Sequence, residues 1–245
     1  MTKKNFQKII LDILFPIRCI VCDQYDFWIC PECFEKIKIL SDQICPECKK
    51  VFTKNGEFCF TCRGKNPLDG ILVASLYREN KKRTVLAKLI HHYKYRFISE
   101  IGIDLAKILE KAILKSTLPL PDIIIPVPLH SRRLRWRGFN QALFMARYLG
   151  ENLTPGFSIP VAENLLLRRR DTQPQMEIKN RNARQANVAQ AFELNQELIE
   201  KYRLKQKTVF LIDDVATTGS TLNECAKVLK EHKVKKVYAV VLARQ

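Results

Sequence analysis

Residues 209–221, VFLIDDVATTGST, combine a short apolar run, two adjacent acids and a turn rich in threonine and glycine. The apolar run contains β-branched residues and is typical of a strand buried on both faces of a parallel sheet. Asp213 and Asp214 follow it directly, and ligands of open α/β sheets collect at the carboxyl ends of the strands. Carboxylates placed there accept hydrogen bonds from the vicinal hydroxyls of a sugar. The stretch therefore predicts the sugar-binding half of a site.

The turn after the acids supplies what a phosphate needs: hydroxyls, a glycine able to take a positive φ, and the N–H groups of a helix N-terminus. Its residues are Ala216, Thr217, Thr218, Gly219, Ser220 and Thr221. Thr221 and Glu224 have the spacing of a capping box, so we expect a helix to begin here. A solvated strand, turn and helix is the alternative, but the whole ordered run favours a site for a phosphorylated sugar.

The chain has 245 residues, which is room for one α/β domain of about 170 residues and a small additional module. Its apolar content of 47% is that of a globular protein with a proper core. The formal net charge of +17 favours polyanionic ligands. Nucleic acid, pyrophosphate and an acidic membrane surface all fit that charge, which alone does not choose among them.

Eight of the nine cysteines form four Cys-x-x-Cys pairs. The pairs are Cys19 with Cys22, Cys30 with Cys33, Cys45 with Cys48, and Cys59 with Cys62. Each pair offers two thiolates, and a tetrahedral zinc ion takes two such pairs, so we expect two structural zinc ions. The spacing leaves open which pairs share an ion. The ninth cysteine, Cys225, is expected in the core of the helix after the phosphate turn.

The first residues do not read as a targeting segment. Residues 1–15 are too charged for a signal peptide, and no run approaches the roughly 18 apolar residues of a membrane span. Thiols kept reduced for zinc predict a cytoplasmic location. Residues 5–15 have the apolar spacing of a short amphipathic helix, which we expect to pack against the zinc module rather than on a membrane.

After about residue 66 the pattern changes to alternating strands and helices. Expected strands cover residues 70–77, 122–127, 161–167, 209–212 and 237–242, and expected helices cover 82–93, 100–114 and 139–149. This alternation predicts a doubly wound parallel sheet with right-handed crossovers. We therefore divide the chain into a zinc module over residues 1–66 and an α/β domain over residues 67–245.

A second cluster of functional residues lies at residues 126–141, PVPLHSRRLRWRGFNQ. We expect its four arginines, Arg132, Arg133, Arg135 and Arg137, to crowd a loop that leaves a strand. A guanidinium group can donate two parallel hydrogen bonds to two phosphate oxygens. The cluster therefore predicts pyrophosphate or nucleic-acid phosphate as ligand. Trp136 could stack on a base and is left open. A further basic loop beginning at Arg168 is polar enough for a mobile lid.

These features together resemble the ComF family of competence proteins, which join a type I phosphoribosyltransferase-like fold to an amino-terminal double zinc ribbon. The resemblance is carried by the cysteine pairs, Lys94-Tyr95, Pro126-Val-Pro128, Arg137-Gly-Phe-Asn-Gln141, residues 184–192 and the phosphosugar signature. It implies phosphoribosyl pyrophosphate with magnesium as ligand. Asp213 and Asp214 would then hold the ribose and act as the catalytic acids, the turn would hold the 5-phosphate, and Arg137 and Lys94 would be further substrate-binding residues.

The same resemblance implies a role in the uptake of single-stranded DNA during natural transformation. Single-stranded DNA and the DNA-uptake proteins are then the expected partners, and peripheral association with the inner face of the membrane is open. Two other functions compete: a nucleobase phosphoribosyltransferase of nucleotide salvage, and a zinc-dependent interaction scaffold with a vestigial sugar site. The sequence does not assign turnover, an acceptor base, a protein partner or an oligomeric state.

Overall fold

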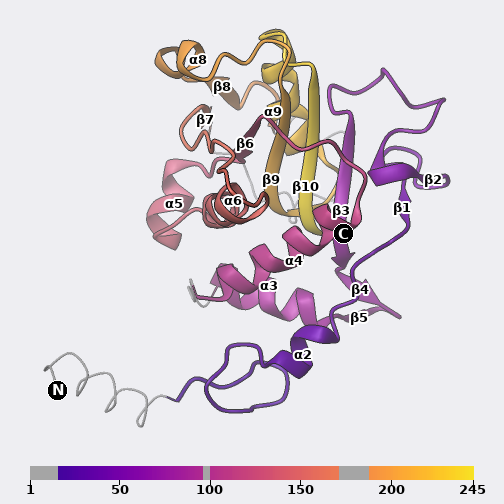
Figure 1. Cartoon of the computed structure of the whole chain (residues 1–245), viewed down its shortest axis with the longest axis vertical. Helices are drawn as coiled ribbons and strands as arrows, with labels where there is room; N and C mark the ends of the chain where they lie inside the picture. Colours follow the sequence, from indigo (N-terminus) through magenta and orange to yellow (C-terminus); the bar gives the residue numbers. More distant parts are fainter. Residues whose placement is uncertain (1–15, 96–99, 171–187) are drawn as a thin grey trace, which may run out of the picture.

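A four-stranded parallel sheet lies at the centre of the computed structural model, which describes residues 16–95, 100–170 and 188–245 (Figure 1). The strand order is β3 (Gly70–Leu76), β10 (Lys236–Arg244), β9 (Thr208–Ala216), β6 (Ile123–Pro126). The main helices are α3 (Val85–Tyr95), α4 (Ile101–Lys115), α6 (Gln141–Asn152) and α9 (Ser220–Glu231). The helix expected at residues 5–15 lies outside the described residues.

Helices cover both faces of this sheet, as the doubly wound prediction requires. Neighbouring residues of a strand point to opposite faces, so each strand contributes to two cores. Phe210 and Val240 pack in the core that contains α3, α4 and α6. Leu211 and Val241 pack in the core beneath α9. The predicted α/β fold is confirmed.

The amino-terminal cysteine-rich segment covers the outer edge of β3. The side chain of Gln43 donates to the carbonyl of Val73 (3.0 Å) and accepts from the Val73 N–H (3.1 Å). Two residues along the strand, Ser75 donates its hydroxyl to the carbonyl of Lys38 (2.7 Å). An unpaired strand edge is a template for aggregation, so these contacts protect the sheet.

The two halves of the cysteine-rich segment lie on different sides of that edge. Figure 1 shows α2 (Pro31–Glu35) beside α3 and α4, whereas β1 (Gln43–Ile44) and β2 (Phe52–Thr53) lie beside β3. The first cysteine group accordingly belongs to the core of α3, α4 and α6, and the second belongs to the core of α9. The zinc module is thus part of both cores of the sheet, and the boundary at residue 66 stays a prediction.

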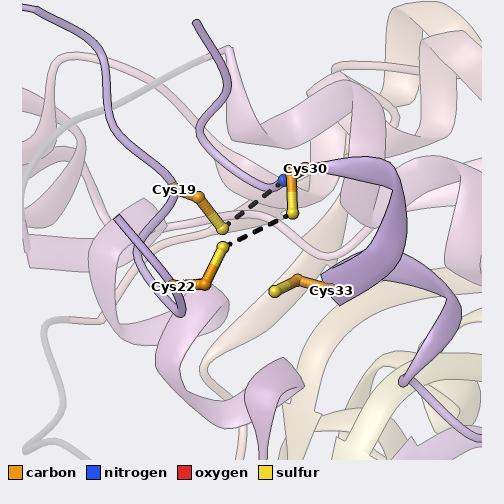
Figure 2. A group of neighbouring side chains, drawn as sticks. All are labelled: Cys19, Cys22, Cys30 and Cys33. Carbon is orange, nitrogen blue, oxygen red and sulfur yellow. Dashed lines mark hydrogen bonds between the residues drawn. The ribbon is translucent and has the colours of Figure 1, made fainter. Parts of the chain in front are cut away.

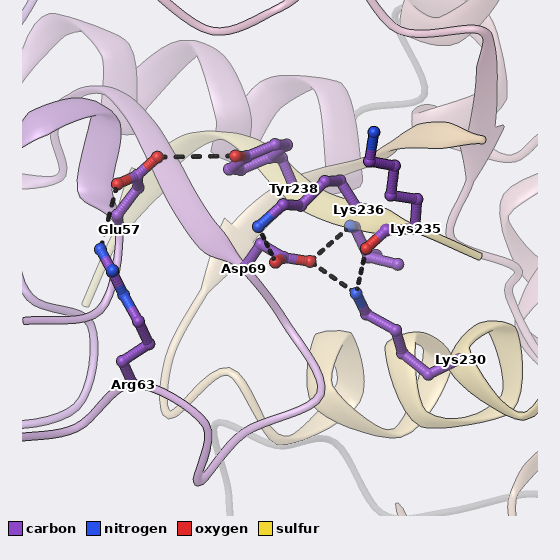
Figure 3. Close-up of polar contacts among 8 residues, drawn as sticks. Glu57, Arg63, Asp69, Lys230, Lys235, Lys236 and Tyr238 are labelled. Carbon is purple, nitrogen blue, oxygen red and sulfur yellow. Dashed lines mark hydrogen bonds and ion pairs between the residues drawn. The ribbon is translucent and has the colours of Figure 1, made fainter. Parts of the chain in front are cut away.

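Asp69, just before β3, ties the start of the sheet to α9 (Figure 3). It accepts hydrogen bonds from Lys230 (2.8 Å), from Lys236 (2.9 Å) and from the N–H of Val237 (2.8 Å). Burial alone would raise the pKa of Asp69, but the two lysines hold it below its usual value. This network fixes the end of the sheet opposite the predicted site.

Two expected elements near the edges of the sheet were wrong in extent. The helix expected over residues 82–93 begins at Val85, because β4 (Arg78–Glu79) and β5 (Lys82–Arg83) form a hairpin before it. The residues between these strands, Asn80 and Lys81, both have positive φ, as in a two-residue hairpin turn. The spacing of apolar residues does not reveal such a turn without an Asn-Gly signal.

The strand expected over residues 161–167 is divided. Val161 makes only an isolated parallel bridge to Ile124, and after a turn β7 (Leu166–Arg168) pairs with β8 (Phe192–Leu194) in a separate antiparallel sheet. Helix α8 (Gln196–Tyr202) was not predicted. Its signal was Asn195, whose side chain caps the helix by accepting from the N–H of Glu197.

No helix in the described part of the chain is long and apolar enough to cross a bilayer.

Replacing Gln43 should show how much the edge contact contributes. Gln43→Ala removes both hydrogen bonds and leaves the Val73 N–H and carbonyl unsatisfied, so we expect the free energy of unfolding to fall by roughly 2–4 kcal/mol. Urea denaturation measures this, with the exposed Gln196→Ala as the matched control. Equal stability of the two variants would show that the edge contact is dispensable.

Candidate functional site

Strand β9 carries the two acids inside the sheet rather than beyond it. The predicted strand ends at Ile212, but β9 continues to Ala216 because β10 keeps pairing with it, with Asp213 opposite Val241 and Ala216 opposite Arg244. The predicted position of the acids after the strand is therefore corrected by a few residues. Both acids line a cavity of about 490 Å³ at this end of the sheet.

Asp214 forms an ion pair with Lys94, near the end of α3. The Lys94 Nζ lies 2.7 Å from Asp214 Oδ1, and the two side chains are only 14% and 10% exposed. Burial and the charge of Asp214 raise the pKa of the neighbouring Tyr93. Little water reaches either charge, so breaking this ion pair is costly unless a ligand contacts the partner that is released.

Asp213 lies next to this pair and has a strongly shifted pKa. Burial, with the charge of Asp214 as the second cause, raises the pKa of Asp213 to about 7, against the opposing effect of Lys94. Its Oδ1 accepts a hydrogen bond from the Asp214 N–H (2.8 Å). The site therefore holds one carboxylate, Asp213, that can change its charge near neutral pH.

The turn after β9 delivers the backbone to the start of α9. Gly219 has a φ of 80° and is the N-cap residue of the helix. The expected capping box of Thr221 and Glu224 is wrong, since Thr221 lies within the helix and Glu224 accepts from the N–H of Gln190 instead (2.7 Å). The first N–H groups of a helix have no partner within it, so this turn has the geometry on which the phosphate prediction rests.

The structure brings most of the predicted turn residues to the cavity. Those that line it are Ala216, Thr217, Gly219, Ser220 and Thr221. Thr218 instead borders a separate hollow with Lys65 and Lys227, and its hydroxyl lies 2.7 Å from that of Ser220. Thr218 therefore positions the hydroxyl of Ser220 and does not face the cavity itself.

Two residues of the arginine cluster, Arg133 and Arg137, line the same cavity as the acids. The residues of the cluster form a short helix, α5 (Ser131–Arg137), where a loop was expected. Arg137 donates to the Oε1 of Gln141 (3.0 Å), while Arg137 Nε and Gln141 Nε2 are buried donors without a hydrogen-bond partner among the described residues. Buried donors cost free energy when unsatisfied, so this wall of the cavity is built for an acceptor-rich ligand.

Sequence reasoning missed or left open several lining residues. They are Tyr95, Trp136, Asn140, Gln141 and Arg168. Asn140 caps α6 by accepting from the N–H of Ala142 (3.1 Å). Its position between Gly138 and an apolar helical pattern was the available signal. Most of the loop predicted to be a mobile lid, residues 171–187, lies outside the described part of the chain, and so does Arg184.

The cysteines form two groups of four, which settles which pairs belong together. The first group is Cys19, Cys22, Cys30 and Cys33, and Figure 2 shows its sulfur atoms turned toward one another. The second is Cys45, Cys48, Cys59 and Cys62. Within each group the sulfur atoms all lie within 4.8 Å of one another. Sulfurs on a tetrahedral zinc ion are about 3.8 Å apart, so both groups fit structural zinc.

The thiols of the first group show why a cation is needed. Burial raises the pKa of Cys19, but hydrogen bonds from the N–H groups of Cys30 and Cys22 outweigh it and bring the pKa to about 6. Burial and the neighbouring sulfurs raise the pKa of Cys33 to about 12. Four thiolates therefore do not coexist at neutral pH unless a metal neutralises them and displaces the protons.

Comparisons with known proteins agree with both parts of this site. Residues 10–63 match the model of a double zinc ribbon domain, and residues 162–245 match that of a phosphoribosyl transferase domain. Competence protein F of Haemophilus influenzae is 33% identical over 221 residues, which cover 88% of this chain and 90% of that protein. DNA utilization protein YhgH is 32% identical in Salmonella typhi and 30% identical in Escherichia coli K12, over 82% of this chain and 84% of each relative.

Metal analysis should find two zinc ions per chain. Cys30→Ser removes one ligand of the first group, so we expect about one zinc ion per chain and a lower melting temperature, because that group is part of the core of α3, α4 and α6. Cys225→Ala is the matched control, since Cys225 lies in neither group. A full complement of zinc in Cys30→Ser would contradict the grouping.

The raised pKa of Asp213 predicts a pH-dependent cost in stability. Between the ordinary carboxyl pKa and about 7, the folded protein holds a proton that the unfolded chain has lost, so stability falls as pH rises through this range. Asp213→Asn cannot ionise and should raise the melting temperature at pH 8, by on the order of 5 °C, and much less at pH 5. Scanning calorimetry at both pH values tests this, with Asp42→Asn as control. An equal shift at both would contradict it.

Proposed function

Because the chain belongs to the ComF family of competence proteins, we propose that it binds phosphoribosyl pyrophosphate with magnesium and serves the uptake of single-stranded DNA. The observation that supports this most is the single cavity around which Asp213, Asp214, the turn before α9 and Arg137 converge. The names of the relatives, a competence protein and DNA utilization proteins, support the role in DNA handling.

Each part of the cavity suits one part of this ligand. Asp213 and Asp214 accept hydrogen bonds from the two vicinal hydroxyls of the ribose. The hydroxyls and N–H groups between Ala216 and Thr221 bind the 5-phosphate at the start of α9. Arg137 and Lys94 bind the diphosphate, which gives the unsatisfied Arg137 Nε an acceptor.

In this scheme the carboxylate of Asp214 and the diphosphate of the ligand compete for the ammonium group of Lys94. It is paired with Asp214 in the protein alone, at 2.7 Å. Ribose hydroxyls that donate to Asp214 replace part of that contact, and Lys94 turns toward the diphosphate. Magnesium, when bound, would neutralise part of the diphosphate charge. The carboxylate oxygens of Asp213 and Asp214 are ligands of the kind that this ion prefers.

Transfer of the ribose would be a displacement of pyrophosphate at the anomeric carbon. Asp213 and Asp214 would favour the positive charge that develops on the sugar, and Arg137 would hold the departing diphosphate. The alternative function, nucleobase salvage, uses the same cavity but gives no purpose to the zinc module. Release of pyrophosphate in the presence of a free nucleobase would favour that alternative.

We place the protein in the cytoplasm, where thiols stay reduced for zinc and incoming single strands arrive. Association with the inner face of the membrane, and contacts with DNA-uptake proteins, belong to the same proposal. The net charge of +17 supports contact with either an acidic membrane surface or DNA.

Calorimetry with phosphoribosyl pyrophosphate and magnesium tests the proposal on zinc-replete protein. Replacing both acids, in Asp213→Asn with Asp214→Asn, should weaken binding roughly 10- to 100-fold, because two charged acceptors for ribose hydroxyls become neutral. Asp42→Asn, an exposed acid in the zinc module, should bind like the wild type. Unchanged affinity of the double variant would exclude use of these acids.

A further inference from the structure

We propose that Tyr95 and Trp136 form an aromatic platform at the mouth of the cavity, on which the bases of single-stranded DNA stack. The exposed arginines of α5, Arg132 and Arg135, would hold the phosphates of the same strand. This inference rests on the proposed function, because it identifies where the DNA of that proposal binds. It is carried by the placement of the rings, the charge around them and the neighbouring cavity.

The rings come from two helices that meet at the cavity. Tyr95 is the last residue of α3 and Trp136 lies near the end of α5, with ring centroids 6.3 Å apart in an edge-to-face arrangement. His91, one helical turn before Tyr95, lies 4.9 Å from it. Trp136 is 58% exposed and Tyr95 is 43% exposed. A tryptophan that packs against a second ring and is yet open to solvent offers a rigid surface for stacking.

The surroundings of the platform are strongly cationic. All four arginines of the cluster lie on α5, the same helix as Trp136, and Arg132 and Arg135 are exposed. The guanidinium of Arg137 lies 5.9 Å from the centre of the Tyr95 ring. No Asp or Glu occurs between Asp122 and Glu151 in the sequence. Aromatic rings among positive charges are the combination by which proteins bind single strands without reading their sequence.

Single-stranded DNA fits this surface better than a membrane does. A membrane-binding helix inserts a broad apolar face, whereas α5 has only seven residues and four of them are arginine. Duplex DNA is also unsuitable, because its bases are already stacked and paired. Tyr95 and Trp136 both border the cavity, so a strand stacked on them passes the entrance of the phosphosugar site.

The chain has only two tryptophans, which allows a direct optical test. Trp28 lies in the zinc module and packs against the core of α3, α4 and α6, so Trp28→Phe leaves Trp136 as the sole tryptophan. Titration of that variant with a dT oligonucleotide should quench its fluorescence to saturation. An abasic oligonucleotide of equal length, with the same phosphates but no bases, should bind more weakly and quench little.

Affinity measurements in the wild-type background give a second readout. Anisotropy of a labelled dT oligonucleotide should show that Trp136→Ala weakens binding about 5- to 150-fold for one stacked base, and that Tyr95→Ala also weakens it. Trp136→Phe should retain most of the affinity, since it keeps a ring. Phe157→Ala, which removes an exposed aromatic in the loop after α6, is the matched control and should bind like the wild type.

Salt dependence separates stacking from charge. Trp136→Ala should leave the slope of log affinity against log salt unchanged, while Arg135→Gln should reduce it by about 0.7, the value for one phosphate contact with a single strand. If Trp136→Ala instead changes the slope of log affinity against log salt and still prefers dT over the abasic strand, stacking by this ring is overturned.

The outcomes also distinguish this inference from the function on which it rests. If wild type binds the dT oligonucleotide but Trp136→Ala binds it equally well, the platform is wrong and the DNA role stands. If wild type binds phosphoribosyl pyrophosphate but no oligonucleotide, the DNA role fails together with the platform. Saturable quenching by free thymine, or by anionic vesicles alone, would assign the rings to a nucleobase or a membrane instead and overturn the inference.

Discussion

The parallel pairing of β9 with β10 out to Ala216 is the constraint on which the site depends. It carries two carboxylates into a sheet whose other β9 residues are almost all apolar and buried. Burial of a charge is expensive unless it is paired, and Asp214 is paired with Lys94 whereas Asp213 has a raised pKa. The arrangement costs stability, and a ligand that donates hydrogen bonds to both acids recovers part of that cost.

The zinc module serves the same sheet from the other side. β3 is an edge strand, and the cysteine-rich segment crosses that edge so that each group of four cysteines packs into a different core. Gly56 shows how close this packing is, because a Cβ built at this position would lie 2.0 Å from the carbonyl oxygen of Ile71. We therefore expect loss of zinc to loosen the sheet as a whole, so that the metal would contribute to the site without lying in it.

Much of this arrangement could be predicted from local sequence. The strand, the acids and the glycine of the turn all lie in one continuous segment between Val209 and Gly219. The spacing of the paired cysteines alone predicts zinc binding. What escaped prediction depends on contacts between distant residues. The strand reaches Ala216 only because β10 continues beside it, and Asp214 meets Lys94 across more than a hundred residues.

The errors have a common physical origin. A capping box at Thr221 was a reasonable expectation from spacing, but Gly219 takes the N-cap position and Glu224 is used by the backbone of Gln190. The arginines between Arg132 and Arg137 were expected in a loop because they follow the end of a strand, yet the side chain of His130 caps a helix by accepting from the N–H of Arg132. In both cases a tertiary or capping contact decided between local structures of similar free energy.

The chemistry of the ligands explains why the cavity and the outer surface should serve different molecules. Asp213 and Asp214 together need a pair of vicinal hydroxyls, and the sugar of DNA lacks the 2-hydroxyl that would provide the second. A DNA phosphate in the same place would meet two carboxylates and be repelled. The exposed arginines and rings of α5 and Tyr95 impose neither condition, because they contact phosphates and base faces that every DNA strand presents. If both proposals hold, the acids reserve the interior for a ribose, while the cationic rim remains available to DNA at the entrance of the same cavity.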